Sequence, residues 1–153
     1  MLLEDSAGQV LRRATSYLLP LAVRGLPYQC WNCGLGDFAV ALIHVGDGLD
    51  TFDDMVTTAR GVPLAYAAAL LAADDHPQSD TVRVRPSRTI GQRYLSNGCT
   101  RCDALFGEFF VQEEIGKVFA AGEPERLPEL WTGQRPAIEW YTLRGLTGLE
   151  RFS

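Results

Sequence analysis

The four cysteines of this chain form two Cys-x-x-Cys pairs, a spacing that is typical of metal sites. Cys30 and Cys33 lie in "CWNCG", Cys99 and Cys102 lie in "CTRC", and 65 residues separate the pairs. Four thiolates complete a tetrahedral shell for zinc, and the two-residue spacer lets one tight turn aim both sulfurs at a single point. We therefore predict one structural Zn²⁺ per chain, bound by these four cysteines.

The residue that follows each pair should support the turn. Gly34 suits a position that needs a positive φ angle. Asp103 stands in the same place after the second pair, and aspartate is one of the few other residues that tolerate this geometry. Closing the gap between the pairs costs about 4 kcal/mol of chain entropy. Zinc binding, on the order of 10 kcal/mol or more in small peptides, exceeds that cost.

Other uses of the cysteines are alternatives at this point. Iron in a rubredoxin-like site would use the same geometry. Paired disulfides suit small secreted proteins, and a thioredoxin-like redox site needs only one pair. The two histidines are His44, in an apolar segment, and His76, in a polar one. A closed shell of four sulfurs leaves no position for either of them.

The residues just before the second pair are rich in polar side chains. One interpretation is that they hydrogen-bond to the cysteine turns and stiffen the metal site. The other is that they line a pocket for a phosphate or a peptide terminus. The candidates for these roles, including a tryptophan inside the first pair, are Trp31, Ser87, Arg88, Thr89, Tyr94 and Asn97.

Charge is distributed unevenly along the chain. The net charge is −5, but residues 81–102 hold five arginines and no acidic residue, so this segment carries +5 and the remainder −10. A basic stripe on an acidic body is compatible with nucleic-acid or phosphate binding. It is equally compatible with arginines that pair with the protein's own carboxylates. The nucleic-acid candidates are Arg83, Arg85, Arg88, Arg93 and Arg101.

The elements that must position the cysteines follow from the spacing of apolar residues. A capping box at Ser6 predicts an N-terminal helix that ends before Pro20. "LAVRGLPYQ" then leads into the first pair as an extended segment or turn. "DFAVALIHV" predicts a buried strand. "FDDMVTTAR" predicts a short helix, and a second, alanine-rich helix follows over residues 63–73.

The second half of the chain carries a weaker pattern. "TVRVRP" alternates and predicts a strand with Val82 and Val84 inward and Arg83 and Arg85 outward. We expect another strand over residues 106–111, a helix in "QEEIGKVFAAG", and a docked but irregular tail. The predicted fold is therefore α+β, with a small antiparallel sheet, a zinc-ribbon-like double knuckle, an N-terminal helix and a helical insertion at about 46–80. We expect one zinc-stabilised domain over residues 1–153.

Composition limits the class of protein. Hydrophobic residues make up 46% and charged residues 22%, as in globular proteins. No apolar run approaches the ~20 residues that span a bilayer. Glu4 and Asp5 stand where a secretory signal would be positive. We therefore expect a cytoplasmic protein that does not associate with membranes.

The motifs around the two pairs resemble those of a bacterial group with a zinc-ribbon-like double-cysteine site and no characterised activity. The shared pattern is Cys-Trp-x-Cys-Gly, then Ser-Arg-Thr, a glycine, a tyrosine and an asparagine before Cys-x-x-Cys, then Ala-Leu-x-Gly and aromatics. Outside the cysteines, the matching residues here are Trp31, Gly34, Ser87, Arg88, Thr89, Gly91, Tyr94, Asn97, Ala104, Leu105, Gly107, Phe109 and Phe110. The group usually has proline and glycine where this chain has Thr100 and Asp103. The resemblance implies the metal site and no particular activity.

No hydrolase elbow, P-loop or nucleophile–base pair is present in the local sequence. We therefore expect a non-catalytic, zinc-stabilised binding or interaction protein, with a protein partner or a second copy of itself. The first alternative is a nucleic-acid- or phosphate-binding protein that uses the arginine-rich segment 83–101. The second is an enzyme with a pocket near the zinc unit, with His44 or an aspartate as the acid–base group.

Overall fold

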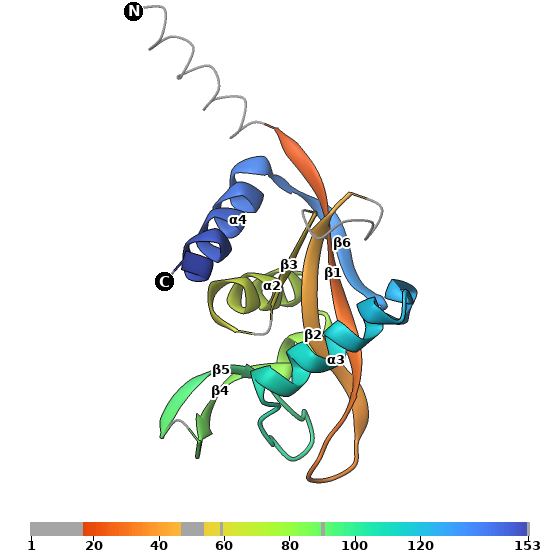
Figure 1. Ribbon diagram of the computed structural model, residues 1–153, viewed down its shortest axis with the longest axis vertical. Helices are drawn as coiled ribbons and strands as arrows, with labels where there is room; N and C mark the ends of the chain where they lie inside the picture. The colour runs from red at the N-terminus through yellow and green to blue at the C-terminus, as the bar shows by residue number, and fades with distance from the viewer. Residues whose placement is uncertain (1–16, 47–53, 59, 90, 153) are drawn as a thin grey trace, which may run out of the picture.

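The computed structural model of the protein describes residues 17–46, 54–58, 60–89 and 91–152. The predicted N-terminal helix lies outside the described residues, except that Leu18 already belongs to a strand. Within the described part the protein is a mixed α+β structure with two antiparallel sheets (Figure 1).

The larger sheet has four antiparallel strands in the order β3-β2-β1-β6. Its strands are β1 (Leu18–Gln29), β2 (Gly36–Val45), β3 (Met55–Thr57) and β6 (Glu129–Pro136). The predictions of an extended segment before the first cysteine pair and of a buried strand after it are confirmed, because these two segments form the hairpin β1–β2. The register of the β1–β2 pairing shifts between Arg24 and Gly25 of β1. At this position Ala41 of β2 has no partner in β1.

Helices cover both faces of this sheet and bury its apolar side chains. α2 (Gly61–Ala73) and α4 (Ala137–Phe152) lie on one face, and α3 (Glu108–Ala120) lies on the other (Figure 1). Val40 and Ile43 of β2 pack towards α2 and α4, whereas Ala39 and Leu42 pack towards α3. The centre of β2 is therefore apolar on both sides, as its unbroken run of apolar residues predicts.

The smaller sheet is the hairpin of β4 (Val82–Ser87) and β5 (Gln92–Asn97), which follows the short 3₁₀ helix η2 (Pro77–Thr81). The predicted strand is confirmed, but the predicted side-chain orientation is wrong for Val84 and Arg85. Arg85 is only 1% exposed, whereas Val84 is 54% exposed. Alternation along a strand indicates which residues share a face, but it does not indicate which face is buried. Here the face that carries Arg83 and Arg85 is the one that contacts Asp103, after β5.

Three other predictions are corrected by the structure. Residues 55–57 of the predicted helix "FDDMVTTAR" are the edge strand β3, because Met55 and Val56 pair with β2 and fill the core. Residues 108–111 of the predicted strand 106–111 are the first turn of α3. The tail is regular rather than irregular, because it forms the 3₁₀ helix η3 (Pro124–Arg126), β6 and α4. The helices predicted at 63–73 and in "QEEIGKVFAAG" are confirmed within α2 and α3.

Candidate metal centre

The two cysteine pairs lie in turns that the two sheets bring together. The first pair forms the turn of the hairpin β1–β2, and the second follows β5 (Figure 1). We call residues 30–34 the first knuckle and residues 99–103 the second knuckle. Asn97, at the end of β5, links the two sheets, because its side chain makes two hydrogen bonds, of 2.8 and 2.9 Å, with the backbone of Val40 in β2.

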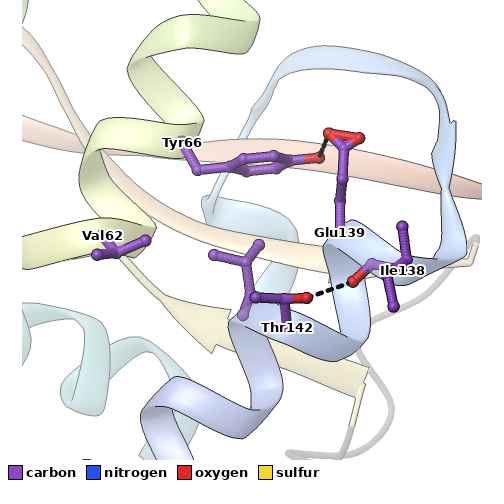
Figure 2. A pocket seen from close by; sticks show the side chains of 6 residues that line it. Val62, Tyr66, Ile138, Glu139 and Thr142 are labelled. Atoms are coloured by element: carbon purple, nitrogen blue, oxygen red, sulfur yellow. Dashed lines mark hydrogen bonds between the residues drawn. The ribbon is translucent and has the colours of Figure 1, made fainter.

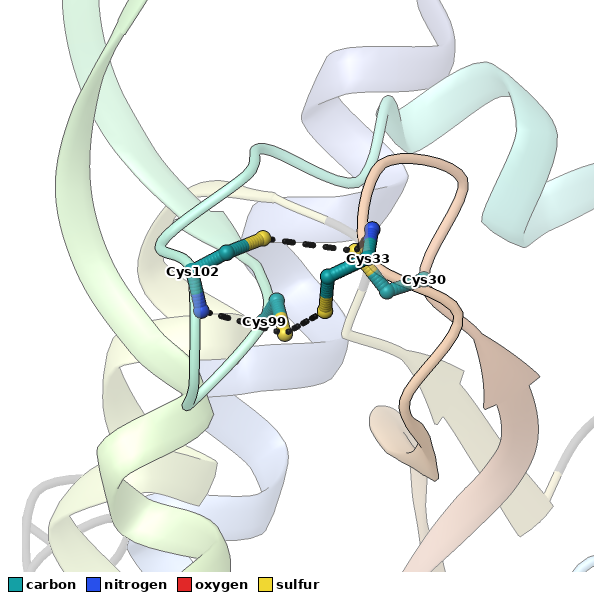
Figure 3. A group of neighbouring side chains, drawn as sticks. All are labelled: Cys30, Cys33, Cys99 and Cys102. Carbon is teal, nitrogen blue, oxygen red and sulfur yellow. Dashed lines mark hydrogen bonds between the residues drawn. The ribbon is translucent and has the colours of Figure 1, made fainter.

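All four sulfur atoms converge on one point (Figure 3). The Sγ atoms of Cys30 and Cys102 are 3.6 Å apart, those of Cys33 and Cys99 are 3.5 Å apart, and all four lie within 4.8 Å of one another. Disulfide sulfurs lie about 2.0 Å apart, so these are four free thiols. A tetrahedron with metal–sulfur bonds of about 2.3 Å has edges of about 3.8 Å, and the sulfur cluster has dimensions close to this. The donor set therefore fits zinc, and iron would use the same ligands.

The two knuckles repeat one hydrogen-bond pattern. In the first, the amides of Asn32 and Cys33 donate to Cys30 Sγ at 3.4 and 3.5 Å. In the second, the amides of Arg101 and Cys102 donate to Cys99 Sγ at the same two distances. Such donors spread the negative charge that accumulates on a four-thiolate site.

The turn backbone is repeated as well. Gly34 donates to the carbonyl of Cys30, and Asp103 donates to the carbonyl of Cys99, both at 3.0 Å. Gly34 has a φ of 79° and Asp103 a φ of 65°. Asp103 therefore adopts the left-handed conformation that the sequence predicted for it. Equivalent turns, built from different residues, present both pairs of sulfurs in the same way.

The environment differs between the first and the second cysteine of each knuckle. Cys30 and Cys99 are 3% and 2% exposed, whereas Cys33 and Cys102 are only half-buried. A backbone hydrogen bond at Leu35 lowers the pKa of Cys33 to about 6, and Arg101 adds to this effect. The Asn32 side chain lowers the pKa of Cys102, whereas burial raises that of Cys99. The lowered pKa of Cys33 and of Cys102 favours the thiolate, which is the form that binds metal.

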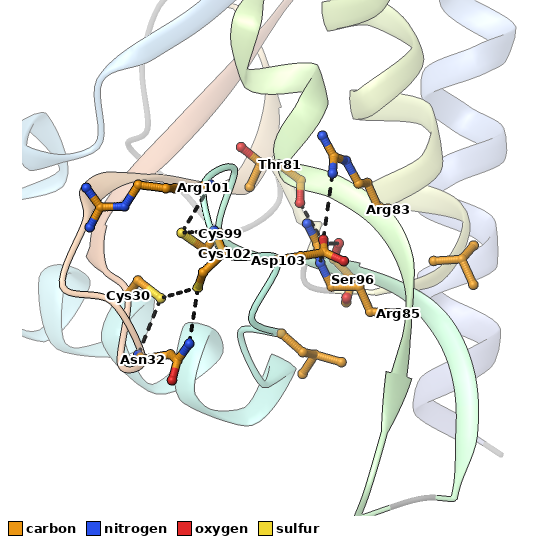
Figure 4. A network of polar contacts seen from close by, with 12 residues as sticks. Cys30, Asn32, Thr81, Arg83, Arg85, Ser96, Cys99, Arg101, Cys102 and Asp103 are labelled. Atoms are coloured by element: carbon orange, nitrogen blue, oxygen red, sulfur yellow. Dashed lines mark hydrogen bonds and ion pairs between the residues drawn. The ribbon is translucent and has the colours of Figure 1, made fainter.

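Side chains from each knuckle also contact the other (Figure 4). Asn32 Nδ2 donates to Cys102 Sγ at 3.5 Å, and Arg101 donates to the carbonyl of Cys33 at 2.9 Å. Trp31 Nε1 donates to the carbonyl of Leu105 at 2.8 Å, just beyond the second knuckle. Of the polar residues predicted to support the site, the structure brings Trp31 and Asn97 to it.

The remaining predicted support residues lie elsewhere. Ser87 pairs with Gln92 at the last register position of the hairpin β4–β5, so Arg88 and Thr89 belong to its tip. This tip is five residue steps, or about 16 Å, from the end of the hairpin where Asn97 lies. Tyr94 lies between the two, and burial and Glu108 raise its pKa.

The arginine segment is engaged by the protein itself at four of its five positions, because Arg93 also donates to the carbonyl of Val84, at 3.4 Å. Arg85 Nε donates to Asp103 at 2.9 Å and Arg85 Nη1 donates to the carbonyls of Thr81 and Ser96 at 2.9 and 2.8 Å (Figure 4). Arg83 lies 3.8 Å from the same carboxylate, and Arg101 holds the first knuckle. Arg88 and Arg93 are exposed on the hairpin. The proposed interpretation that arginines pair with the protein's own carboxylates therefore describes Arg83 and Arg85.

Two residues that were not predicted from the sequence take part in the contacts around the knuckles, Gly98 beside Arg85 and Asn32 beside Cys102. Gly98 carries no side chain, and a Cβ atom built there would overlap the Arg85 guanidinium. Asn32 was not among the predicted support residues, although it lies inside the first pair. The only signal for Gly98 is its position directly before Cys99, where a close approach of two chain segments favours glycine.

Neither histidine lies in the sulfur cluster. His44 is fully buried in β2, where its Nε2 accepts a hydrogen bond of 2.9 Å from Arg24 Nε. His76 Nδ1 accepts from the amide of Gln78 and caps η2. Both histidines therefore have structural roles in the described part of the chain.

A pocket of about 200 Å³ lies between α2 and α4 (Figure 2). Tyr66 O–H donates to Glu139 at 3.1 Å beside it, and Arg135 holds the same carboxylate through two nitrogens. The lining residues are Val62, Tyr66, Ile138, Glu139, Thr142 and Leu143. They include no cysteine, no histidine and no residue of the arginine segment.

Comparisons with known proteins do not identify a family, so the assignment of the metal centre depends on the geometry described above. No protein-family model, no curated protein and no solved structure matches the chain. None of the described helices combines the length and the apolar character that crossing a bilayer requires.

Proposed function

We propose that Cys30, Cys33, Cys99 and Cys102 hold one structural Zn²⁺ and that the protein is a non-catalytic binding or interaction module. The observation that carries the metal assignment is the repeated knuckle. Two turns with the same amide-to-sulfur distances place four thiols within 4.8 Å of one another, although 65 residues separate them. When bound, zinc would supply a cross-link between the two sheets and no reactive group, because four sulfurs fill its shell.

The non-catalytic role is supported by what surrounds the centre. His44, the proposed acid–base group of the enzyme alternative, is buried in the sheet and bound to Arg24. The pocket between α2 and α4 is lined almost entirely by apolar atoms around a Tyr66–Glu139–Arg135 network that is already satisfied. In both places the polar groups named here already have protein partners: Arg24 for His44, and Tyr66 and Arg135 for Glu139.

A binding role is supported by the aromatic side chains near the knuckles. Trp31 and Phe109 are each 70% exposed, and Phe110 is 60% exposed. Trp31 contacts Leu105, and Phe109 and Phe110 lie in the first turn of α3, shortly after Leu105 in the chain. Exposed aromatic rings are enriched at protein interfaces, so we propose that this surface contacts another protein chain, a second copy included. The arginine segment supports nucleic-acid binding less well, because Asp103 and the first knuckle engage three of its arginines.

The test is native mass spectrometry with elemental analysis on protein purified without added metal. We expect one zinc per chain, and the same spectrum reports the number of subunits. Iron in the same stoichiometry would keep the four-cysteine site and change the metal. Protein that carries no metal and takes up none when zinc is added would contradict the proposal. A Phe109→Ala, Phe110→Ala double variant should keep its zinc and lose the partner or the second copy.

A further inference from the structure

The sulfur cluster has an inner and an outer side. The first cysteine of each knuckle, Cys30 and Cys99, belongs to the core between the sheet and α3. The second cysteine of each, Cys33 and Cys102, is half-buried. Among the described residues, the side of Cys33 and Cys102 is therefore the one from which a competing ligand reaches the cluster more easily.

The outer side is where the knuckles hold each other. Asn32 and Arg101 occupy the same position in the two knuckles, directly before the second cysteine. Asn32 Nδ2 donates to the Cys102 sulfur at 3.5 Å, and Arg101 Nη2 donates to the Cys33 carbonyl at 2.9 Å. Each of these side chains thus contacts the second cysteine of the opposite knuckle, and Figure 4 shows the contact of Asn32 with Cys102.

The charge of the site gives Arg101 a second effect. A divalent ion with four thiolates carries a net charge of about −2, and hydrogen bonds and cations near the sulfurs stabilise this charge. Arg101 is a cation whose side chain contacts the Cys33 carbonyl, so it places a positive charge beside the sulfur cluster. Metal loss must begin with the separation of one thiolate, and the two more accessible cysteines are Cys102, whose sulfur accepts from Asn32, and Cys33, whose carbonyl accepts from Arg101.

We propose that the metal enters and leaves through the face formed by Cys33 and Cys102, and that Arg101 and Asn32 are positioning residues that keep this face closed. The inference rests on the proposed function, because it requires a metal in the site. It adds to that function a route for metal exchange and the two residues that control its rate.

The first test is the rate of metal transfer to an excess of a chromogenic chelator. Arg101→Gln removes the cation, and we expect release about tenfold faster than from the wild type, in line with the usual effect of residues that support metal ligands. Asn32→Ala should accelerate release by a smaller factor. Arg101→Lys retains the charge and should restore part of the wild-type rate. Arg93→Gln, at an exposed arginine on the hairpin β4–β5, is the control and should release metal at the wild-type rate.

The second test uses the wild type alone, so it does not depend on the folding of a variant. Metal-loaded protein is treated with iodoacetamide for increasing times, and the modified cysteines are mapped by peptide mass. We expect Cys33 and Cys102 to be alkylated before Cys30 and Cys99. Cobalt-loaded Arg101→Gln should also show a shifted thiolate-to-metal absorption band, which a purely structural effect elsewhere would not produce.

The outcomes separate this inference from the proposed function. Wild-type release rates in both Arg101→Gln and Asn32→Ala, or equal acceleration in Arg93→Gln, overturn the inference while leaving the metal site in place. Alkylation of Cys30 or Cys99 first overturns it as well. A wild-type protein that binds no metal and shows no cobalt–thiolate band instead contradicts the proposed function itself.

Discussion

Asp103 occupies in the second knuckle the position that Gly34 occupies in the first, and both have a positive φ, of 65° and 79°. The left-handed conformation costs a non-glycine residue about 1 kcal/mol or more. The structure shows what Asp103 supplies in return. Its carboxylate accepts a hydrogen bond of 2.9 Å from Arg85, which is only 1% exposed, and also lies 3.8 Å from Arg83.

Asp103→Gly should therefore destabilise the protein, even though glycine suits the backbone. Removing the carboxylate leaves the buried Arg85 charge without its counter-ion, which outweighs the relief of strain. Because the Asp103 side chain is itself 58% exposed, we expect a net loss of about 2 kcal/mol in the free energy of unfolding. Urea unfolding of Asp103→Gly and of Asp103→Asn, which keeps an acceptor, measures the difference. A glycine variant as stable as the wild type would show that Arg85 does not need this partner.

Loss of a buried cysteine should be more damaging than loss of an outer one. Cys30 and Cys99 are enclosed by the core, so Cys30→Ser or Cys99→Ser removes a ligand and buries a hydroxyl in its place. We expect insoluble protein, or protein that has lost its near-ultraviolet circular dichroism, and no bound zinc. Cys33→Ser should retain more structure, because the replaced sulfur is half-buried. A well-folded, metal-free Cys30→Ser, Cys99→Ser double variant would contradict the structural role of the metal.

The cysteine turns were predictable from the sequence because their geometry is local. A two-residue spacer and a residue that tolerates positive φ define the turn without reference to the rest of the chain, and the structure has both knuckles in this form. The helix over residues 63–73 was predictable for the same reason, since Pro63 and the alanine-rich run that follows favour it locally. Both interpretations needed only a few adjacent residues.

The errors arose where distant contacts decide the structure. Residues 55–57 form a strand because β2 offers them an edge to pair with, and no local signal reports that edge. A strand in "TVRVRP" was predicted, but its buried face depends on the contacts of Arg85 with Asp103 and Gly98, which follow more than ten residues later. Phe109 and Phe110 suggested a strand by composition, yet they are exposed on the first turn of α3.

Gly98 should not accept a larger residue, because the Arg85 guanidinium occupies the space of its missing side chain. A Cβ atom at Gly98 would lie 2.6 Å from Arg85 Nη1 and closer still to two other guanidinium atoms. We expect Gly98→Ala to lower the free energy of unfolding by about 2 kcal/mol or more, as overpacking of a core does. Gly36→Ala is the matched control, since a Cβ atom there meets nothing within 4 Å.

A double-mutant cycle identifies the cause of the Gly98→Ala effect. If the overlap with Arg85 is responsible, the substitution should cost clearly less in an Arg85→Ala background than in the wild type. Equal costs in the two backgrounds, measured by urea unfolding, would assign the effect to the backbone of the second knuckle instead.

Tyr66 should make the protein sensitive to alkaline pH independently of the metal. Burial first, and then the nearby Glu139 carboxylate, raise the pKa of Tyr66 from 10 to about 12. The unfolded chain therefore loses this proton at lower pH than the folded protein does, so the contribution of Tyr66 to stability is complete below pH 10 and is lost as the pH rises towards 12. Phenolate absorbance, recorded after rapid pH jumps, should contain a step near pH 12 that Tyr66→Phe removes. Glu139→Gln should move that step to lower pH. A step that persists in Tyr66→Phe would show that it does not belong to Tyr66, and a step that Glu139→Gln leaves in place would show that the carboxylate does not raise this pKa.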